Sequence, residues 1–278
     1  METNKIYNED CLEGLKKIEG NSIDLVITSP PYNVDLGNNK YHKSPYDLYN
    51  DNKDHQDYIK WLKEVFSELF KKQCIGGRCC INIGDGRNGA VPTSSDIIQF
   101  MKEIGYIPIT HIIWDKSQVG NRTSWGSFNS PSCPSFPTPF EHILIFAKGD
   151  RKLQRKGETD LTKEEFIAWS LALWKFAPET KQKEFGHNAM FPEELPKRLI
   201  KMFSWKNAKV CDPFSGAGTV ALVCQKLGRD FIGFEISEEY CKIANERIQK
   251  ELSQSKLNDG NDGIPPKPKD LGILPNFI

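Results

Sequence analysis

The sequence lacks features that would assign it to several large classes of protein. No apolar run approaches the roughly 18 residues of a membrane span, and the first residues, Met-Glu-Thr-Asn-Lys, are polar and acidic. Lysine plus arginine and aspartate plus glutamate number 37 each, so no net positive charge attracts nucleic acid to the whole surface. We therefore expect a soluble cytoplasmic protein without membrane contact, in which any nucleic-acid contact comes from local patches.

The eight cysteines and five histidines lack the spacings that mark metal sites. No C-x-x-C pair and no H-E-x-x-H motif occurs, and the histidines are scattered along the chain. Several cysteines lie inside apolar runs, for example in Cys79-Cys80-Ile81, as buried thiols of a reducing compartment do. The sequence therefore predicts reduced thiols and no metal.

What the sequence does contain is an alternation of strand and helix patterns. In residues 57–72, apolar residues recur at spacings of 3, 4 and 3, which predicts a helix with one apolar face formed by Ile59, Leu62, Phe66 and Leu69. The other predicted helices cover residues 97–104, 193–203, 217–227 and 238–252. Strands are predicted at residues 23–27, 78–84, 109–114, 142–147, 208–212 and 230–234. This alternation favours an α/β fold with a largely parallel sheet.

Three segments interrupt the alternation. Residues 117–139 are rich in Ser, Pro, Gly and Asn with interspersed aromatic residues, which predicts an ordered functional loop. Residues 148–156 carry one acidic residue and five basic ones, which suits a phosphate-contacting patch and a solvated surface loop equally. The five basic residues are Lys148, Arg151, Lys152, Arg155 and Lys156. Residues 253–278 are predicted to be a flexible tail behind a single domain that spans residues 1–252.

The first motif is Thr-Ser-Pro-Pro-Tyr-Asn at residues 28–33, directly after the strand predicted at 23–27. The two prolines fix two φ angles and remove two N–H donors, so the local carbonyls point outward without competition. Ser29, the Pro30 carbonyl and Tyr32 could form a planar socket, with two acceptors for an exocyclic amino group and a ring face for a flat base. A rigid proline turn without further function explains the same residues equally well.

The second motif is Val-Cys-Asp-Pro-Phe-Ser-Gly-Ala-Gly-Thr at residues 210–219, between a predicted strand and a predicted helix. Its glycines let the backbone turn tightly and approach a ligand closely. Glu235 closes the next predicted strand, 23 positions after Asp212, where a carboxylate can accept hydrogen bonds from both ribose hydroxyls of an adenosine-containing cofactor. A NAD site has a similar pattern, but Ala221 replaces the third glycine, and Asp212 suits a ligand's ammonium group rather than a pyrophosphate.

Together the two motifs resemble those of amino-methyltransferases that use S-adenosyl-L-methionine. Their order, with Ser-Pro-Pro-Tyr first and Asp-Pro-Phe-x-Gly-x-Gly-Thr near the C terminus, resembles the circularly permuted β group of DNA methyltransferases, the family that acts on cytosine N4 or adenine N6. The resemblance covers most of residues 4–250. It implies a Rossmann-like class I methyltransferase fold, with a seven-stranded, mostly parallel sheet that has one antiparallel strand.

The resemblance also implies roles for individual residues. The residues implied to act in catalysis are Ser29, Pro30, Pro31 and Tyr32. The residues implied to bind the cofactor are Asp10, Cys11, Asp212, Phe214, Ser215, Gly216, Gly218, Thr219 and Glu235. In this assignment Asp10 accepts from the adenine amino group, Glu235 holds the ribose, and residues 212–219 line the methionine end. Residues 187–195 resemble the family segment that precedes the cofactor strand.

The chemistry that the resemblance implies is direct transfer of a methyl group to an aromatic amine. The lone pair of such a nitrogen is delocalised into the ring, so two acceptors, Ser29 and the Pro30 carbonyl, are expected to favour a pyramidal nitrogen. Tyr32 is expected to stack on the base, which must flip out of the duplex at a cost on the order of a few kcal/mol. The rival C5-cytosine chemistry usually uses a Pro-Cys dipeptide, which this chain lacks because Cys133 precedes its proline.

The choice of base depends on position 29. Many family members have aspartate there, and the serine form found in this chain is more often associated with cytosine N4 than with adenine N6. Residues 123–127 and 130–132 are also similar to loops of the N4-cytosine members. We therefore predict a cytosine-N4-specific DNA methyltransferase of a restriction-modification system, with adenine N6 specificity as the alternative.

Two more distant alternatives stay open. One is a methyltransferase of RNA or of protein glutamine, although those relatives usually carry asparagine at position 29 and have the cofactor motif first. The other is a DNA-binding regulator without catalysis, against which the intact motifs argue. The expected partners are double-stranded DNA, contacted by target-recognition segments at 117–139 and 148–184, and, from the family, a cognate restriction endonuclease and a second copy of the chain.

Overall fold

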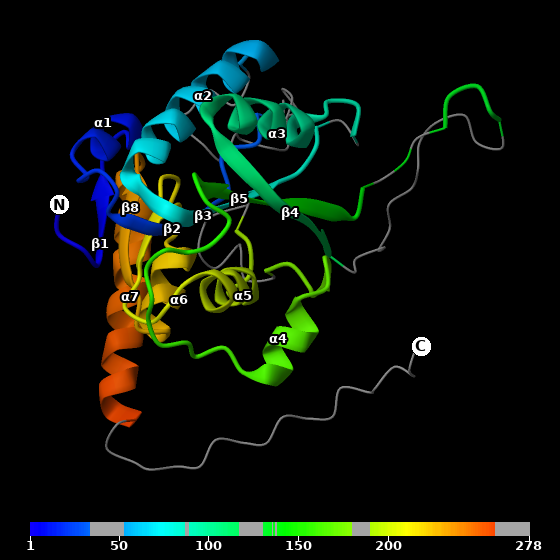
Figure 1. Ribbon diagram of the computed structural model, residues 1–278. Coiled ribbons are helices and arrows are strands. Elements are labelled where there is room, and N and C mark those ends of the chain that lie inside the picture. Colours follow the sequence, from blue (N-terminus) through cyan, green and yellow to red (C-terminus); the bar gives the residue numbers. More distant parts are fainter. Residues whose placement is uncertain are drawn as a thin grey trace.

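A computed structural model of the chain describes residues 1–33, 53–86, 89–116, 130–134, 136, 138–179 and 190–258. In this part of the chain, eight strands form one sheet in the order β1-β8-β7-β2-β3-β5-β4-β6, with helices on both faces (Figure 1). The strands are β1 (Lys5–Asn8), β2 (Ile23–Thr28), β3 (Gln73–Ile83), β4 (Tyr106–Asp115), β5 (Phe140–Lys148), β6 (Leu173–Lys175), β7 (Lys209–Asp212) and β8 (Asp230–Glu235). The helices are α1 (Cys11–Lys16), α2 (His55–Lys72), α3 (Thr93–Ile104), α4 (Lys163–Trp169), α5 (Glu194–Phe203), α6 (Thr219–Lys226) and α7 (Glu238–Asn258).

The directions of the strands confirm the expected Rossmann-like sheet. Strand β5 runs antiparallel to both of its neighbours, β3 and β4, and the other neighbouring pairs of the described sheet are parallel. The sheet has one strand more than the expected seven, because the three-residue β6 extends its edge beside β4. This strand belongs to the segment 148–184, in which the sequence predicts no strand beyond residue 148. It is too short to show an alternating pattern, and the fully buried Trp174 holds it in place.

Two apolar layers cover the two faces of the sheet. Helices α1, α2 and α3 pack on one face, and α4, α5, α6 and α7 pack on the other (Figure 1). Strand β2 lies between the layers and all six of its residues are buried. From Leu25 onward its side chains alternate, so that Leu25 and Ile27 join one layer while Val26 joins the other. Ile23 lies in the same layer as Val26, because the strand register shifts between Ile23 and Leu25. The end of β2, and the motif that follows it, is therefore held from both sides.

Helix α2 confirms the helix predicted at 57–72, with two differences. It begins at His55, because the side chain of Asp54 accepts a hydrogen bond from the backbone of Gln56 and so caps the helix. Its buried face includes Tyr58, which is fully buried, instead of the predicted Ile59, which is partly exposed. The apolar spacing therefore predicted the helix correctly but placed its buried face one residue away at the first turn.

The predicted boundary between domain and tail at residue 252 falls inside α7. The helix continues to Asn258, because neither glycine nor proline interrupts it before that point. The remaining residues of the predicted tail, 259–278, lie outside the described part of the chain. None of the helices in the described part is long and apolar enough to cross a membrane.

The carboxyl ends of the parallel strands lie along one edge of the sheet. Asn8 pairs with Glu235, Asp212 pairs with a residue of the same strand β8, and Thr28 is in register with Ile81, near the end of β3. We call this the C-terminal edge. In parallel α/β sheets ligands bind just outside such an edge, and both motifs begin at it.

The basic run at 148–156 lies at the opposite edge, where β2 and β3 begin. Lys148 is buried, and its Nζ donates to a backbone carbonyl at the start of β3 at 2.8 Å. Arg155 pairs with Asp24 of β2 at 2.9 Å, and Arg151 donates to a backbone carbonyl of β4 at 3.1 Å. At least three of the five basic side chains of this run thus form contacts within the protein. The run is an anchored connection, and its position does not favour a phosphate patch beside the motifs.

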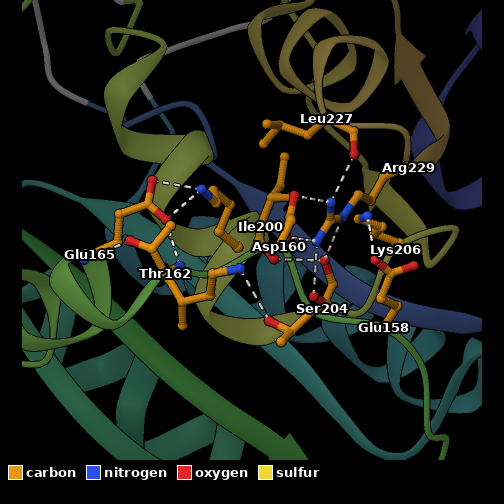
Figure 2. Close-up of polar contacts among 12 residues, drawn as sticks. Glu158, Asp160, Thr162, Glu165, Ile200, Ser204, Lys206, Leu227 and Arg229 are labelled. Carbon is orange, nitrogen blue, oxygen red and sulfur yellow. Dashed lines mark hydrogen bonds and ion pairs between the residues drawn. The ribbon is translucent and has the colours of Figure 1, made fainter. Parts of the chain in front are cut away.

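Polar contacts fix the chain that follows the basic run (Figure 2). Arg229 is buried, and its guanidinium binds both oxygens of Asp160, at 2.6 and 2.8 Å, together with two backbone carbonyls. Glu158 forms a more exposed pair with Lys206 at 2.7 Å. Since Arg229 directly precedes β8, this network also lies at the edge opposite the motifs. The chain returns to the C-terminal edge only with β6, which runs parallel to β4.

Replacing Arg229 with alanine should lower the free energy of unfolding by about 3 kcal/mol, because the carboxylate of Asp160 and the buried carbonyls would lose their donors. The Lys206→Ala variant is the matched control. It removes only the exposed pair with Glu158 and should cost less than about 1 kcal/mol. Urea unfolding followed by circular dichroism measures both values, and equal losses would contradict the anchoring role of Arg229.

Candidate active site

A hydrogen bond joins the two motifs at the C-terminal edge. Thr28, the last residue of β2, donates from Oγ1 to Asp212 Oδ1 at 2.7 Å, although 184 positions separate them in the sequence. Both side chains are buried. Because β2 and β7 are adjacent parallel strands, their ends deliver residues 29–33 and the loop 212–219 to the same place. The structure thus brings together the two groups of residues that the sequence predicts to be functional.

Glycines shape the backbone of the loop 212–219. Gly216 and Gly218 have positive φ angles of 50° and 75°, which glycine adopts without strain, and a Cβ at Gly218 would come within 2.7 Å of a side chain of α7. Ser215 and Thr219 are buried, and Ser215 Oγ donates to the backbone carbonyl three residues earlier at 3.1 Å. These residues therefore present their backbone, rather than their side chains, to a ligand.

Phe214 connects this loop to helix α2. Its backbone N–H donates to Asp212 Oδ1 at 3.1 Å, and its ring lies 5.4 Å from that of Trp61, measured between centroids. Trp61 is one helical turn beyond Tyr58, whose hydroxyl donates to the Pro31 carbonyl at 2.7 Å. Helix α2 thus contacts both motifs and sets the distance between them.

Glu235 ends β8 beside the glycine loop. Its Oε2 accepts from the backbone N–H of Gly216 at 2.8 Å, and its Oε1 accepts from that of Ser237 at 2.8 Å. A carboxylate has about four lone-pair sites. The side chain is therefore fixed by the backbone and can still accept hydrogen bonds from two hydroxyl groups of a ligand.

Burial changes the pKa values of the carboxyl groups of Asp212 and Glu235. It raises the pKa of Asp212 to about 7, opposed by the hydrogen bonds from Thr28 and Phe214 and reinforced by the charge of Glu235. Burial also raises the pKa of Glu235, which its backbone hydrogen bonds oppose. A cationic group bound next to Asp212 would stabilise its ionised form. The loop therefore suits a ligand with a positive charge and vicinal hydroxyl groups.

The raised pKa of Asp212 predicts how the stability of the ligand-free protein depends on pH. The unfolded chain loses this proton near pH 4 and the folded protein near pH 7, so across that interval the folded state binds more protons and stability falls as pH rises. Asp212→Asn keeps an acceptor for Thr28 without the charge, and should stabilise the protein at pH 8 by up to about 4 kcal/mol. Thermal unfolding at pH 5 and pH 8 measures this effect. A variant no more stable than wild type at pH 8 would contradict it.

The residues expected to hold adenine lie next to Glu235, but one of them faces the core. Asn8 donates from Nδ2 to the Glu235 carbonyl at 3.0 Å, and Asp10 is exposed and caps α1 by accepting from a backbone N–H at 2.8 Å. Cys11 is buried in the core, where burial raises the pKa of its thiol to about 12. Only the backbone of Cys11 is placed to meet a ligand, because the first residue of the capped helix turns its side chain inward.

The four residues predicted to act in catalysis have different surroundings. Pro30 is buried, whereas Ser29, Pro31 and Tyr32 are partly exposed. The Pro31 carbonyl accepts from Tyr58, which gives Pro31 a structural role and leaves the predicted acceptor role to the Pro30 carbonyl. The ring of Tyr32 packs against Gly84, where an added Cβ atom would lie 3.2 Å from Cε2 of Tyr32.

Sequence reasoning missed five residues around these motifs. They are Tyr58 and Trp61 of α2, Asn82 of β3, Lys116 after β4, and Glu141 of β5. Asn82 did carry a signal, because it is a polar residue between the apolar residues Ile81 and Ile83 of a predicted strand, whereas Glu141 directly precedes the strand predicted at 142–147. Tyr58 and Trp61 carried none, since aromatic residues spaced by three on an amphipathic helix are typical of a core.

Part of the predicted site lies outside the described residues. The segment 117–139 is described only at 130–134, 136 and 138–139, and residues 187–189 of the segment 187–195 are likewise outside. Within the described ranges, no group of three or more His, Cys, Asp or Glu side chains is arranged to hold a metal ion.

Comparisons with known proteins agree with this geometry. The N6/N4 family model described as DNA methylase matches residues 23–246. The Type II methyltransferase M.MjaI of Methanocaldococcus jannaschii is 32% identical over 266 residues, which cover 84% of this chain and 88% of that protein. M.MjaVI of the same organism is 36% identical over 180 residues, covering 64% and 88%.

Solved structures show the same fold. A candidate DNA modification methylase of Thermus thermophilus, complexed with S-adenosyl-L-methionine, has a TM-score of 0.69 at 26% identity and covers 89% of this chain and 93% of that one. The cytosine-N4-specific PvuII DNA methyltransferase has a TM-score of 0.65 at 21% identity, covering 92% and 93%, which is a likeness of fold. The family match over most of the chain, together with M.MjaI, shows that this protein belongs to the N6/N4 DNA methylase family and is a DNA methyltransferase.

Proposed function

We propose that this protein transfers a methyl group from S-adenosyl-L-methionine to the N4 amino group of a cytosine that is flipped out of double-stranded DNA. The hydrogen bond between Thr28 and Asp212 carries the proposal. It holds the predicted base socket next to the predicted cofactor loop, and a transfer in one step requires the amine and the methyl donor to be neighbours.

S-adenosyl-L-methionine is the cofactor, and the donor set of the site fits it. Its ammonium group would bind Asp212, whose buried carboxyl gains from a cation, and its ribose hydroxyls would bind Glu235. The start of α1, with Asp10, lies beside Glu235 and would meet the adenine. When bound, the cofactor supplies an electrophilic methyl group.

The residues of the first motif would prepare the amine. Ser29 Oγ and the Pro30 carbonyl would each accept a hydrogen bond from one of the two N–H groups of the amine. This favours a pyramidal nitrogen whose lone pair points away from the ring. Tyr32 would stack on the base and hold its plane. No residue of the motif has to form a covalent bond to the base in this reaction.

The preference for cytosine N4 rests on Ser29. A neutral hydroxyl at this position, in place of the aspartate found in many family members, is the feature that we associate with N4 methylation. Adenine N6 is the second candidate, because a Ser-Pro-Pro-Tyr socket offers the same two acceptors to either exocyclic amine.

We place target recognition in residues 117–139 and in the chain that follows β6 up to residue 184. Both segments follow strands that end at the C-terminal edge, because β4 and β6 are parallel. Residues 148–162 are held at the opposite edge by the contacts of Arg155 and Arg229 and are less suited to this task. A restriction endonuclease with the same recognition sequence, and a second copy of this chain, are proposed partners from the family.

The product assay tests the proposal directly. Purified protein would be incubated with cofactor labelled in its methyl group and with duplex DNA of mixed sequence, and the DNA would be digested to nucleosides. We expect the label in N4-methylcytosine, and label in N6-methyladenine would support the second candidate. A protein that binds the cofactor but labels no base in DNA would contradict both.

The Tyr32→Ala variant tests the stacking role. It removes the ring that is expected to hold the base while leaving the cofactor loop intact, so turnover should fall by at least about 100-fold while cofactor affinity changes by less than about threefold. Calorimetric titration gives the affinity and single-turnover methylation gives the rate. An equal loss in both quantities would show that Tyr32 supports the fold of the site rather than the base.

A further inference from the structure

A chain of hydrogen bonds runs from the first motif to a buried carboxylate. Ser29 Oγ lies 3.3 Å from the Tyr32 hydroxyl, which lies 2.9 Å from Glu141 Oε2. Asn82 Nδ2 donates to the hydroxyl oxygen of Tyr32 at 3.0 Å and to Glu141 Oε2 at 2.7 Å. Lys116 forms an ion pair with Oε1, the other oxygen of Glu141, whose side chain is 12% exposed. These groups come from four different segments and converge beside the motif.

The hydrogen bonds of this chain can run in one direction. Glu141, paired with Lys116, accepts hydrogen bonds and donates none. The Tyr32 O–H therefore donates to Glu141, and the amide nitrogen of Asn82 is also a donor to the Tyr32 oxygen. Because the single hydroxyl hydrogen of Tyr32 is used in this way, Ser29 must donate its own O–H to Tyr32. Its hydrogen is directed inward, and its lone pairs are left for a ligand.

We propose that Glu141 is a positioning residue that fixes the Ser29 hydroxyl as an acceptor for the target base. A serine hydroxyl without such a partner donates and accepts equally well, so it would bind a base carbonyl as readily as an amino group. An oriented hydroxyl binds the amino group and rejects the carbonyl. The inference rests on the proposed function and adds a reason why the site selects a base that carries an amine.

The Glu141→Gln variant tests this orientation with little change of shape. The charge of Lys116 attracts the amide oxygen of the new side chain, so its NH₂ group faces Tyr32. This NH₂ group no longer accepts from Tyr32 and Asn82, so the Ser29 hydroxyl loses its fixed direction and can point its hydrogen at the base. We expect kcat for DNA methylation to fall about 10- to 100-fold, while cofactor affinity stays at its wild-type value.

The Tyr32→Phe variant shows whether the effect travels through the hydroxyl. It keeps the stacking ring but breaks the chain between Ser29 and Glu141, so kcat should fall to a similar extent. Adding Glu141→Gln to Tyr32→Phe should then change kcat by less than about twofold, because the link is already absent. Glu158→Gln, which alters an exposed ion pair at the opposite edge, is the matched control and should leave kcat unchanged.

Two results would overturn the inference. One is a Glu141→Gln variant with wild-type kcat, and the other is a double variant in which the two losses multiply, since independent losses mean that Glu141 does not act through Tyr32. Both are read against a wild-type protein that methylates DNA. A wild-type protein that binds the cofactor and transfers no methyl group would instead contradict the proposed function.

Discussion

The contact on which the site depends is the buried hydrogen bond from Thr28 to Asp212. It connects the ends of two adjacent parallel strands, β2 and β7, at the edge where both motifs begin. A buried hydrogen bond to a carboxyl group contributes about 1.5 to 3 kcal/mol when that group is ionised. Its larger effect is geometric, because residue 29 and the loop after Asp212 start one residue from this contact. Helix α2 adds a second constraint through Tyr58 and Trp61.

The antiparallel strand β5 gives the site a group that a fully parallel sheet would not supply there. A parallel strand begins at the edge away from the ligand, whereas β5 begins at the C-terminal edge, so Glu141 near its start lies beside the motif. Lys116, at the end of the neighbouring β4, then supplies the opposite charge. The direction and order of the strands thus place a buried ion pair next to Tyr32. The basic run at 148–156 leaves β5 at its other end and is carried away from the site.

Much of the fold and of the site follows from local patterns in the sequence. The alternation of apolar strands and amphipathic helices predicted the parallel sheet, and the two motifs predicted Ser29, Asp212 and Glu235 at strand ends. Contacts between distant segments could not be predicted, because periodicity does not show which strands are neighbours. This is why Glu141 and Asn82 were missed, and why Cys11 was expected at the site although its thiol faces the core. The short β6 was missed because three residues are too few for a pattern.

The central claim is that Asp212, Glu235 and Ser29 surround one cofactor and one base. A crystal structure with S-adenosylhomocysteine tests it most directly. The claim predicts the amino group of this ligand within hydrogen-bond distance of Asp212, its ribose hydroxyls on Glu235, and its sulfur facing Ser29. A ligand bound elsewhere, or one whose sulfur points away from Ser29, would contradict the account.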